Sequence, residues 1–166
     1  MRKIFSTLVI VLLLFFVFTP SFAMGQLFFF GNSLEGKPAP DFTLSTTSGQ
    51  KLNMTAVREG KSAIIFFWAT WCPHCRSALN ELNQKEKDIQ QQGIKLMVVD
   101  LGESSKVVSA YQKKYNITID MFLDTDSALG ETYNIIGVPT FFLVDAKGIV
   151  RSVGHALPDD YARFLK

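Results

Sequence analysis

Two cysteines, Cys72 and Cys75, are the residues of this chain with the clearest capacity for chemistry. They are its only cysteines and lie in the segment WCPHC, residues 71–75. A pair with this spacing can contribute to a metal site, form a structural disulfide or exchange electrons as a dithiol and a disulfide. Each of these possibilities requires something different from the rest of the chain.

A metal site is the first possibility. A closed zinc site needs about four ligands, and beyond the cysteines the chain offers two histidines, His74 and His155. His74 lies between the cysteines, where its side chain would point away from a metal that they held. A copper(I)-binding module that uses the soft thiolates stays open as an alternative. We expect no metal and no other cofactor, because a dithiol carries electrons itself.

A purely structural disulfide is the second possibility. A cross-link stabilises a protein mainly by closing a loop in the unfolded chain, and the gain grows with the length of that loop. The loop between Cys72 and Cys75 is too short to gain much.

The start of a helix at this pair favours redox chemistry. Pro73 suits the first position of a helix, where its missing N–H has no cost. Cys72 would precede that helix, so free N–H groups and the positive helix end would face its sulfur. This environment favours the thiolate, which is the attacking species in disulfide exchange. Cys75, one turn further along, would be more buried and would resolve the mixed disulfide.

Buried strands and a long helix are expected to position the pair. Residues 62–68 (SAIIFFW) form a continuous apolar run, typical of a strand buried on both faces. Residues 73–92 have a helical spacing of apolar positions, and Gly93 ends that helix. Residues 94–100 (IKLMVVD) predict a second buried strand.

The other elements complete an α/β sandwich with a mixed sheet and helices on both faces. Hairpins are expected over residues 41–53 and 140–153, each around a polar turn with a glycine. Further helices are expected over residues 55–60, 104–115, 127–134 and 158–166. Ser104 or Ser105 would cap the second of these helices, and Asp126 would cap the third.

The first 23 residues resemble a targeting segment. Arg2 and Lys3 precede an apolar run over residues 4–18 and a small-x-small site ending at Ala23, as in a secretory signal peptide. Because residues 28–30 are also apolar, an uncleaved membrane anchor stays an alternative. Residues 24–35 would then form a linker or a first strand. Residues 36–166 would form the folded domain, outside the cytoplasm.

The charge balance argues against one class of partner. Two of the 17 basic residues lie in the first 23 positions, so the remainder of the chain balances its 15 acidic residues. A nucleic-acid-binding protein needs a basic surplus or a basic stripe. We therefore expect no nucleic-acid partner.

Two segments resemble the thioredoxin superfamily. Residues 71–75 (WCPHC) are similar to its active site, and residues 137–140 (GVPT) resemble its cis-proline loop. The resemblance implies that Pro139 faces the disulfide and that Val138 offers backbone groups to an extended partner chain. It also implies that Trp71, Pro73 and His74 contact that partner.

Further segments resemble the TlpA/ResA-like branch of this superfamily. They are residues 36–44, 67–72, 100–103, 123–126 and 142–148, and a central insertion would cover residues 102–116 and the following strand. The resemblance implies an extracytoplasmic thiol–disulfide oxidoreductase that keeps partner cysteines reduced, as in cytochrome c maturation. Its electrons would come from a membrane thiol carrier of the DsbD or CcdA kind.

The chain departs from its relatives at two positions that often carry acids. Phe66 and Ala78 occupy the places where a buried carboxylate would serve the second cysteine, and Glu81 is expected on a solvated helix face. The sequence therefore predicts an apolar environment for Cys75, in which water would handle the proton. Asp100 and Glu103 lie at the carboxyl end of a strand, near where α/β sites gather; a redox role for either stays open as the less favoured interpretation.

Three rival functions stay open. The pair Pro73-His74 also occurs in oxidants of the DsbA type, so an oxidase or isomerase is the first rival, and a reduction potential would distinguish it. A peroxidase is the second, although Ala69 and Ile65 replace the threonine and proline that such enzymes place before the reactive cysteine. The copper(I) module is the third. His155 is expected on the surface, Trp68 in the core and Trp71 beside the disulfide.

Overall fold

The computed structural model describes residues 31–166. The expected signal peptide or anchor, and most of the expected linker, lie outside these residues. Within them, no helix is both long enough and apolar enough to cross a membrane. In chain order the elements are β1 (Thr43–Thr46), β2 (Lys51–Asn53), α2 (Met54–Arg58), β3 (Ala63–Trp68), α3 (Pro73–Gln91), β4 (Lys95–Leu101), α4 (Ser105–Tyr115), β5 (Met121–Asp124), α5 (Ala128–Thr132), β6 (Thr140–Val144), β7 (Val150–Gly154) and the 3₁₀-helix η1 (Tyr161–Leu165).

The expected mixed sheet is present. Its seven strands run in the order β2-β1-β5-β4-β3-β6-β7. The three strands β3, β4 and β5 are parallel, and the outer strands join them in antiparallel fashion. All six residues of β3 are buried, as the uninterrupted apolar run predicts. The central insertion contributes α4 and β5, and β5 lies between β4 and the first hairpin.

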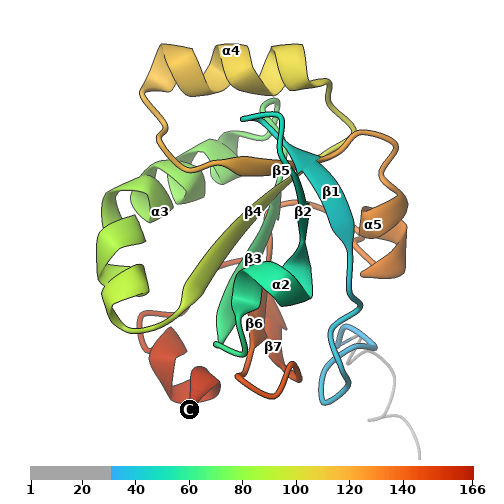
Figure 1. Ribbon diagram of the computed structural model, residues 1–166, viewed down its shortest axis with the longest axis vertical. Helices are drawn as coiled ribbons and strands as arrows, with labels where there is room; N and C mark the ends of the chain where they lie inside the picture. Colours follow the sequence, from blue (N-terminus) through green and yellow to red (C-terminus); the bar gives the residue numbers. More distant parts are fainter. Residues whose placement is uncertain (1–30) are drawn as a thin grey trace, which may run out of the picture. The chain divides into compact units, whose positions relative to one another are not determined.

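Helices cover both faces of the sheet. Figure 1 shows α3 and α5 on opposite sides of the strands. One buried cluster joins α3, α4 and η1 to the side chains of alternate residues of β3. Both cysteines belong to this cluster. A second cluster joins α2 and α5 to the other alternate residues. The redox pair therefore belongs to the α3 face of the sheet.

Three elements differ from the expectations, each for a local reason. The first strand begins at Thr43, because Asp41 and Phe42 bond to the start of α2: the Asp41 carboxylate accepts from the Thr55 N–H and the Phe42 carbonyl from the Met54 N–H. Helix α5 is only five residues long, and its first turn is capped by Asp124 of β5, not by the expected Asp126 alone. The last helix is a short 3₁₀ segment anchored by the buried Leu165.

We predict that Leu79→Ala lowers the free energy of unfolding by about 2–5 kcal/mol. Leu79 lies on the inner face of α3 and is completely buried against the sheet. The control is Asn80→Ala, one residue further along the same helix on its exposed face. Urea unfolding of the oxidised protein would measure both. Equal effects of the two substitutions would show that α3 does not depend on this contact.

Candidate functional site

The two cysteines form a disulfide at the junction of β3 and α3. Their Cα atoms are 5.2 Å apart. Cys72 is the N-cap of α3 and Pro73 is in its first turn, and the backbone N–H of Cys75 points at the Cys72 sulfur at 3.2 Å. Cys72 is 4% exposed and Cys75 is fully buried. The expected helix start and the expected order of burial are both confirmed, and the helix end is positioned to stabilise a Cys72 thiolate.

The loop before β6 lies against the disulfide. The peptide bond between Val138 and Pro139 is cis, as the resemblance implied. The carbonyl oxygen of Val138 is 3.5 Å from the Cys72 sulfur. The hydroxyl of Thr140 donates a hydrogen bond to the Gly137 carbonyl at 2.7 Å, which holds the loop to the strand that follows it. The structure thus brings Val138 together with the redox pair.

A pocket of about 240 Å³ opens on one side of this loop. His74 and Pro139 line it, and so does His155, whose Nδ1 is 2.8 Å from the Pro139 carbonyl oxygen. Glu81 also lines the pocket, and it forms an ion pair with Lys85. His155 is exposed, as expected, but its contact with Pro139 was not anticipated, because the two residues are 16 positions apart and no motif joins them.

Exposed apolar side chains lie on the other side of the loop. Trp71 is 65% exposed and Ile136 is 91% exposed. Both line a pocket of about 250 Å³ together with Val138 and Ile135. Large apolar side chains with this exposure often mark a surface that binds another molecule. The expected position of Trp71 beside the disulfide agrees with this arrangement.

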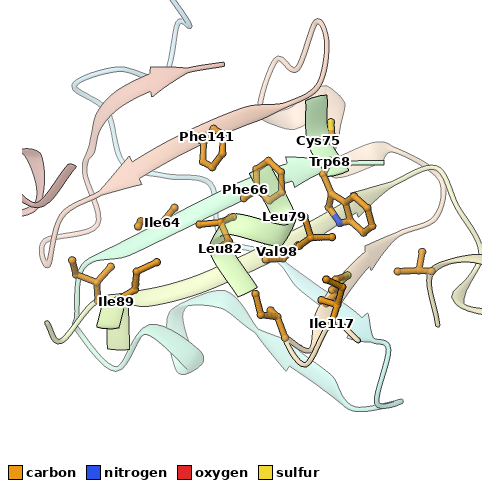
Figure 2. Packing of buried hydrophobic residues seen from close by; sticks show 14 of the residues in the cluster. Ile64, Phe66, Trp68, Cys75, Leu79, Leu82, Ile89, Val98, Ile117 and Phe141 are labelled. Carbon is orange, nitrogen blue, oxygen red and sulfur yellow. The ribbon is translucent and has the colours of Figure 1, made fainter. Parts of the chain in front are cut away.

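Aromatic side chains and one acid lie behind the disulfide. Trp68 is fully buried, as expected, and the ring of Phe66 stacks on that of Phe141 at 4.5 Å between centroids. Figure 2 shows these rings in the same cluster as Cys75. Asp100 lies opposite Trp68 in the ladder between β3 and β4 and is also fully buried. The buried cluster that holds Cys75 is apolar, as predicted, and the strand beside β3 adds a buried carboxyl group opposite Trp68.

Burial and a neighbouring carboxyl group shift the pKa of Asp100. Burial, and then the nearby carboxyl of Glu103, raise the pKa of Asp100 to about 8. Glu103 accepts hydrogen bonds from the Thr70 backbone N–H at 2.5 Å and from the Thr70 hydroxyl at 2.6 Å. Glu103 thus connects the residues after β4 to the segment that leads into Cys72.

The geometry supports thiol–disulfide exchange. A reduced Cys72 would present a thiolate at a helix end, Cys75 lies within bonding distance to displace a bound partner, and the Val138 backbone lies beside them. Among residues 31–166, no group of three or more histidine, cysteine or acidic side chains is arranged to hold a metal ion.

Comparison with known proteins gives consistent matches. The sequence profile of the AhpC/TSA family matches residues 36–153. The thiol-disulfide oxidoreductase ResA of Bacillus subtilis is 28% identical over 80% of this chain and 76% of that protein. The thioredoxin-like protein YneN of the same organism is 32% identical over 72% and 70%. A thiol:disulfide interchange protein of Chlorobium tepidum superposes with a TM-score of 0.64 at 32% identity, over 76% of this chain and 90% of that one.

Proposed function

The chain belongs to the AhpC/TSA family and is a thioredoxin-like thiol–disulfide oxidoreductase of the ResA and DsbE type, and from this premise we propose that it acts as a reductant of cysteine pairs in partner proteins. Cys72 is the attacking residue and Cys75 is the resolving residue. The observation that carries these roles is the Cys75 N–H directed at the Cys72 sulfur, with Cys75 itself fully buried. A partner can therefore reach only Cys72 first.

The partner is a protein segment in extended conformation. Its backbone would pair with Val138 beside the cis bond to Pro139, and its side chains would contact Trp71, Pro73 and His74. Support comes from the two pockets on either side of the loop, one lined by Trp71 and the other by His74. A partner chain that crosses the loop would contact both.

The relatives and the sequence of the first residues support a proposal for the place of the protein in the cell. We propose that the domain, residues 36–166, works outside the cytoplasm, exported by residues 1–23 or anchored by them. A membrane thiol carrier of the DsbD or CcdA kind would supply the electrons, and the cysteines of a protein in cytochrome c maturation would receive them. A disulfide oxidase or isomerase is the alternative that the Pro73-His74 pair favours.

The reduction potential of the Cys72–Cys75 pair tests the direction of electron flow. It would be measured in glutathione buffers at pH 7, with tryptophan fluorescence as the readout. A value below about −220 mV, on the thioredoxin side of the known range, supports the reductant. A value above about −180 mV, toward DsbA, would overturn it in favour of an oxidase or isomerase.

We predict that Trp71→Ala weakens partner binding without weakening the fold. Truncation of an exposed aromatic at the centre of an interface commonly costs about 1–3 kcal/mol of binding, or roughly a 5- to 150-fold rise in KM. The kinetics would use a peptide with an internal disulfide as substrate. The control is Tyr115→Ala, because Tyr115 is another exposed aromatic but lines neither pocket beside the loop. An equal KM for the two variants would remove Trp71 from the partner site.

A further inference from the structure

Asp100 is a buried acid that no part of the exchange mechanism uses. Within residues 31–166 it is the only carboxyl side chain whose two buried oxygens both lack a hydrogen-bond partner. The other buried acids differ in this respect, since Asp124 accepts two backbone N–H bonds and Asp145 pairs with Arg151. An ionised carboxylate without a partner is very unfavourable in a protein interior, so the state of this group needs an explanation.

The fold places Asp100 on the same face of the sheet as the disulfide. Side chains two residues apart on a strand point to the same face. Val98 belongs to the buried cluster that holds Cys72 and Cys75, so Asp100 also faces that side. Its partner in the parallel ladder is Trp68, a member of the same cluster, and the indole nitrogen of Trp68 is buried without a partner too.

Hydrogen bonds connect this region to the segment before Cys72. Glu103, three residues after Asp100, accepts two hydrogen bonds from Thr70, which stands two residues before Cys72. The carbonyl of Thr70 accepts a further hydrogen bond from the side chain of Arg76 in α3 at 2.7 Å. These bonds hold the Glu103 carboxyl, the neighbour of Asp100, against the segment that leads into Cys72.

The charged and titratable groups around Asp100 oppose its ionisation. Glu103 follows the same strand and Asp124 lies on the neighbouring strand β5, and both carboxyls raise the pKa of Asp100. On the helices of this face, Tyr111 of α4 contacts Trp68, and Arg76 is engaged with Thr70. No cation in residues 31–166 forms an ion pair with Asp100 by distance. Two adjacent carboxyls resist simultaneous ionisation.

We propose that Asp100 is a positioning residue for the redox reaction: its buried carboxyl, on the disulfide face of the sheet and without a cationic partner, stays uncharged and thereby leaves the thiolate of reduced Cys72 unopposed by a second buried negative charge. The inference rests on the proposed role of Cys72 but not on the direction of electron flow.

Asp100 does not take part in the bond changes. In reduction, a thiolate of a partner dithiol attacks Cys72, and Cys75 leaves as a thiolate and takes up a proton. The second partner thiolate then attacks the mixed disulfide, so Cys72 leaves as a thiolate and the partner is oxidised to its disulfide. Asp100 keeps its own proton throughout. Because it is neutral, it adds no negative charge that would disfavour the Cys72 thiolate.

A linkage between the two groups follows. When Asp100 ionises at alkaline pH, its charge disfavours the Cys72 thiolate, and equally the thiolate raises the pKa of Asp100 in the reduced protein. At pH values above both pKa values, each unit by which the pKa of Asp100 is higher in the reduced protein than in the oxidised protein lowers the equilibrium constant of reduction tenfold. For a two-electron couple, tenfold equals about 30 mV.

The test compares wild type and Asp100→Asn in the same glutathione buffers from pH 6 to pH 10. We expect the ratio of their equilibrium constants of reduction, wild type over variant, to fall three- to tenfold between pH 7 and pH 10. The exposed Asp159→Asn variant is the control and should give a constant ratio. A ratio for Asp100→Asn that stays constant over this range would overturn the proposal.

A second measurement needs no variant. Carbon-13 NMR of the carboxyl of Asp100 should give a titration near pH 8 in the oxidised wild type and a higher midpoint in the reduced protein. Equal midpoints in the two states, or a midpoint below pH 5, would also overturn the proposal. The value of the wild-type potential at pH 7 tests the reductant role separately, so failure of one inference is distinguishable from failure of the other.

Discussion

Replacing Cys75 with serine is expected to stop turnover and to leave the partner covalently attached to Cys72. The Cys72 thiolate can still attack a partner disulfide, but no second sulfur follows to release the product. With the disulfide peptide as substrate, the rate should fall to the uncatalysed level. A mixed disulfide should accumulate to about one equivalent, which mass spectrometry without reductant would detect.

The matched variant Cys72→Ser separates the two roles. It is expected to lose turnover as well, but to form no adduct, because Cys75 is fully buried and cannot reach a partner first. If the Cys72→Ser variant formed the adduct and the Cys75→Ser variant did not, the assignment of attacking and resolving residues would be reversed. Turnover by either variant at the wild-type rate would rule out exchange through this pair.

The sequence predicts the parts of the site that depend on neighbours along the chain. The start of α3 at Pro73 follows from the chemistry of helix ends, and the burial of β3 follows from its continuous apolar run. The cis bond before Pro139 came from a family resemblance and not from composition. In each case the signal lies within a few residues, so it can be read without knowing which strands pair.

The features that the sequence did not predict depend on contacts between distant segments. The role open to Asp100 depends on its pairing with Trp68, 32 positions earlier, in a parallel ladder whose register no local pattern specifies. The contact of His155 with Pro139 depends on the return of the chain after β7. Asp124 caps α5 from the end of a strand, whereas local reasoning pointed to Asp126, the nearer residue in sequence.

Asp100→Asn is expected to change how the stability of the protein depends on pH. Folding raises the pKa of Asp100 from 3.8 to about 8. Between these values the folded state binds a proton that the unfolded state has released, so the wild type loses stability as pH rises from about 4 to about 8. At 1.36 kcal/mol per pH unit, the free energy of unfolding of the wild type is lower by about 5 kcal/mol at pH 8, and this loss is absent below pH 4. Asparagine has no charge to lose, so the variant lacks this loss.

Urea unfolding of the oxidised proteins at several pH values from 4 to 9 would measure the effect. The free energy of unfolding of the variant, minus that of the wild type, should rise by about 5 kcal/mol between pH 4 and pH 8 and then level off. Any constant penalty from burying an amide cancels in this difference, and Asp159→Asn should show no such rise. A loss of this size is a large part of the free energy of unfolding of a typical domain, which is about 5–15 kcal/mol. A flat difference would mean that Asp100 is charged or paired in the folded protein, and the redox coupling proposed for it would then have no physical basis.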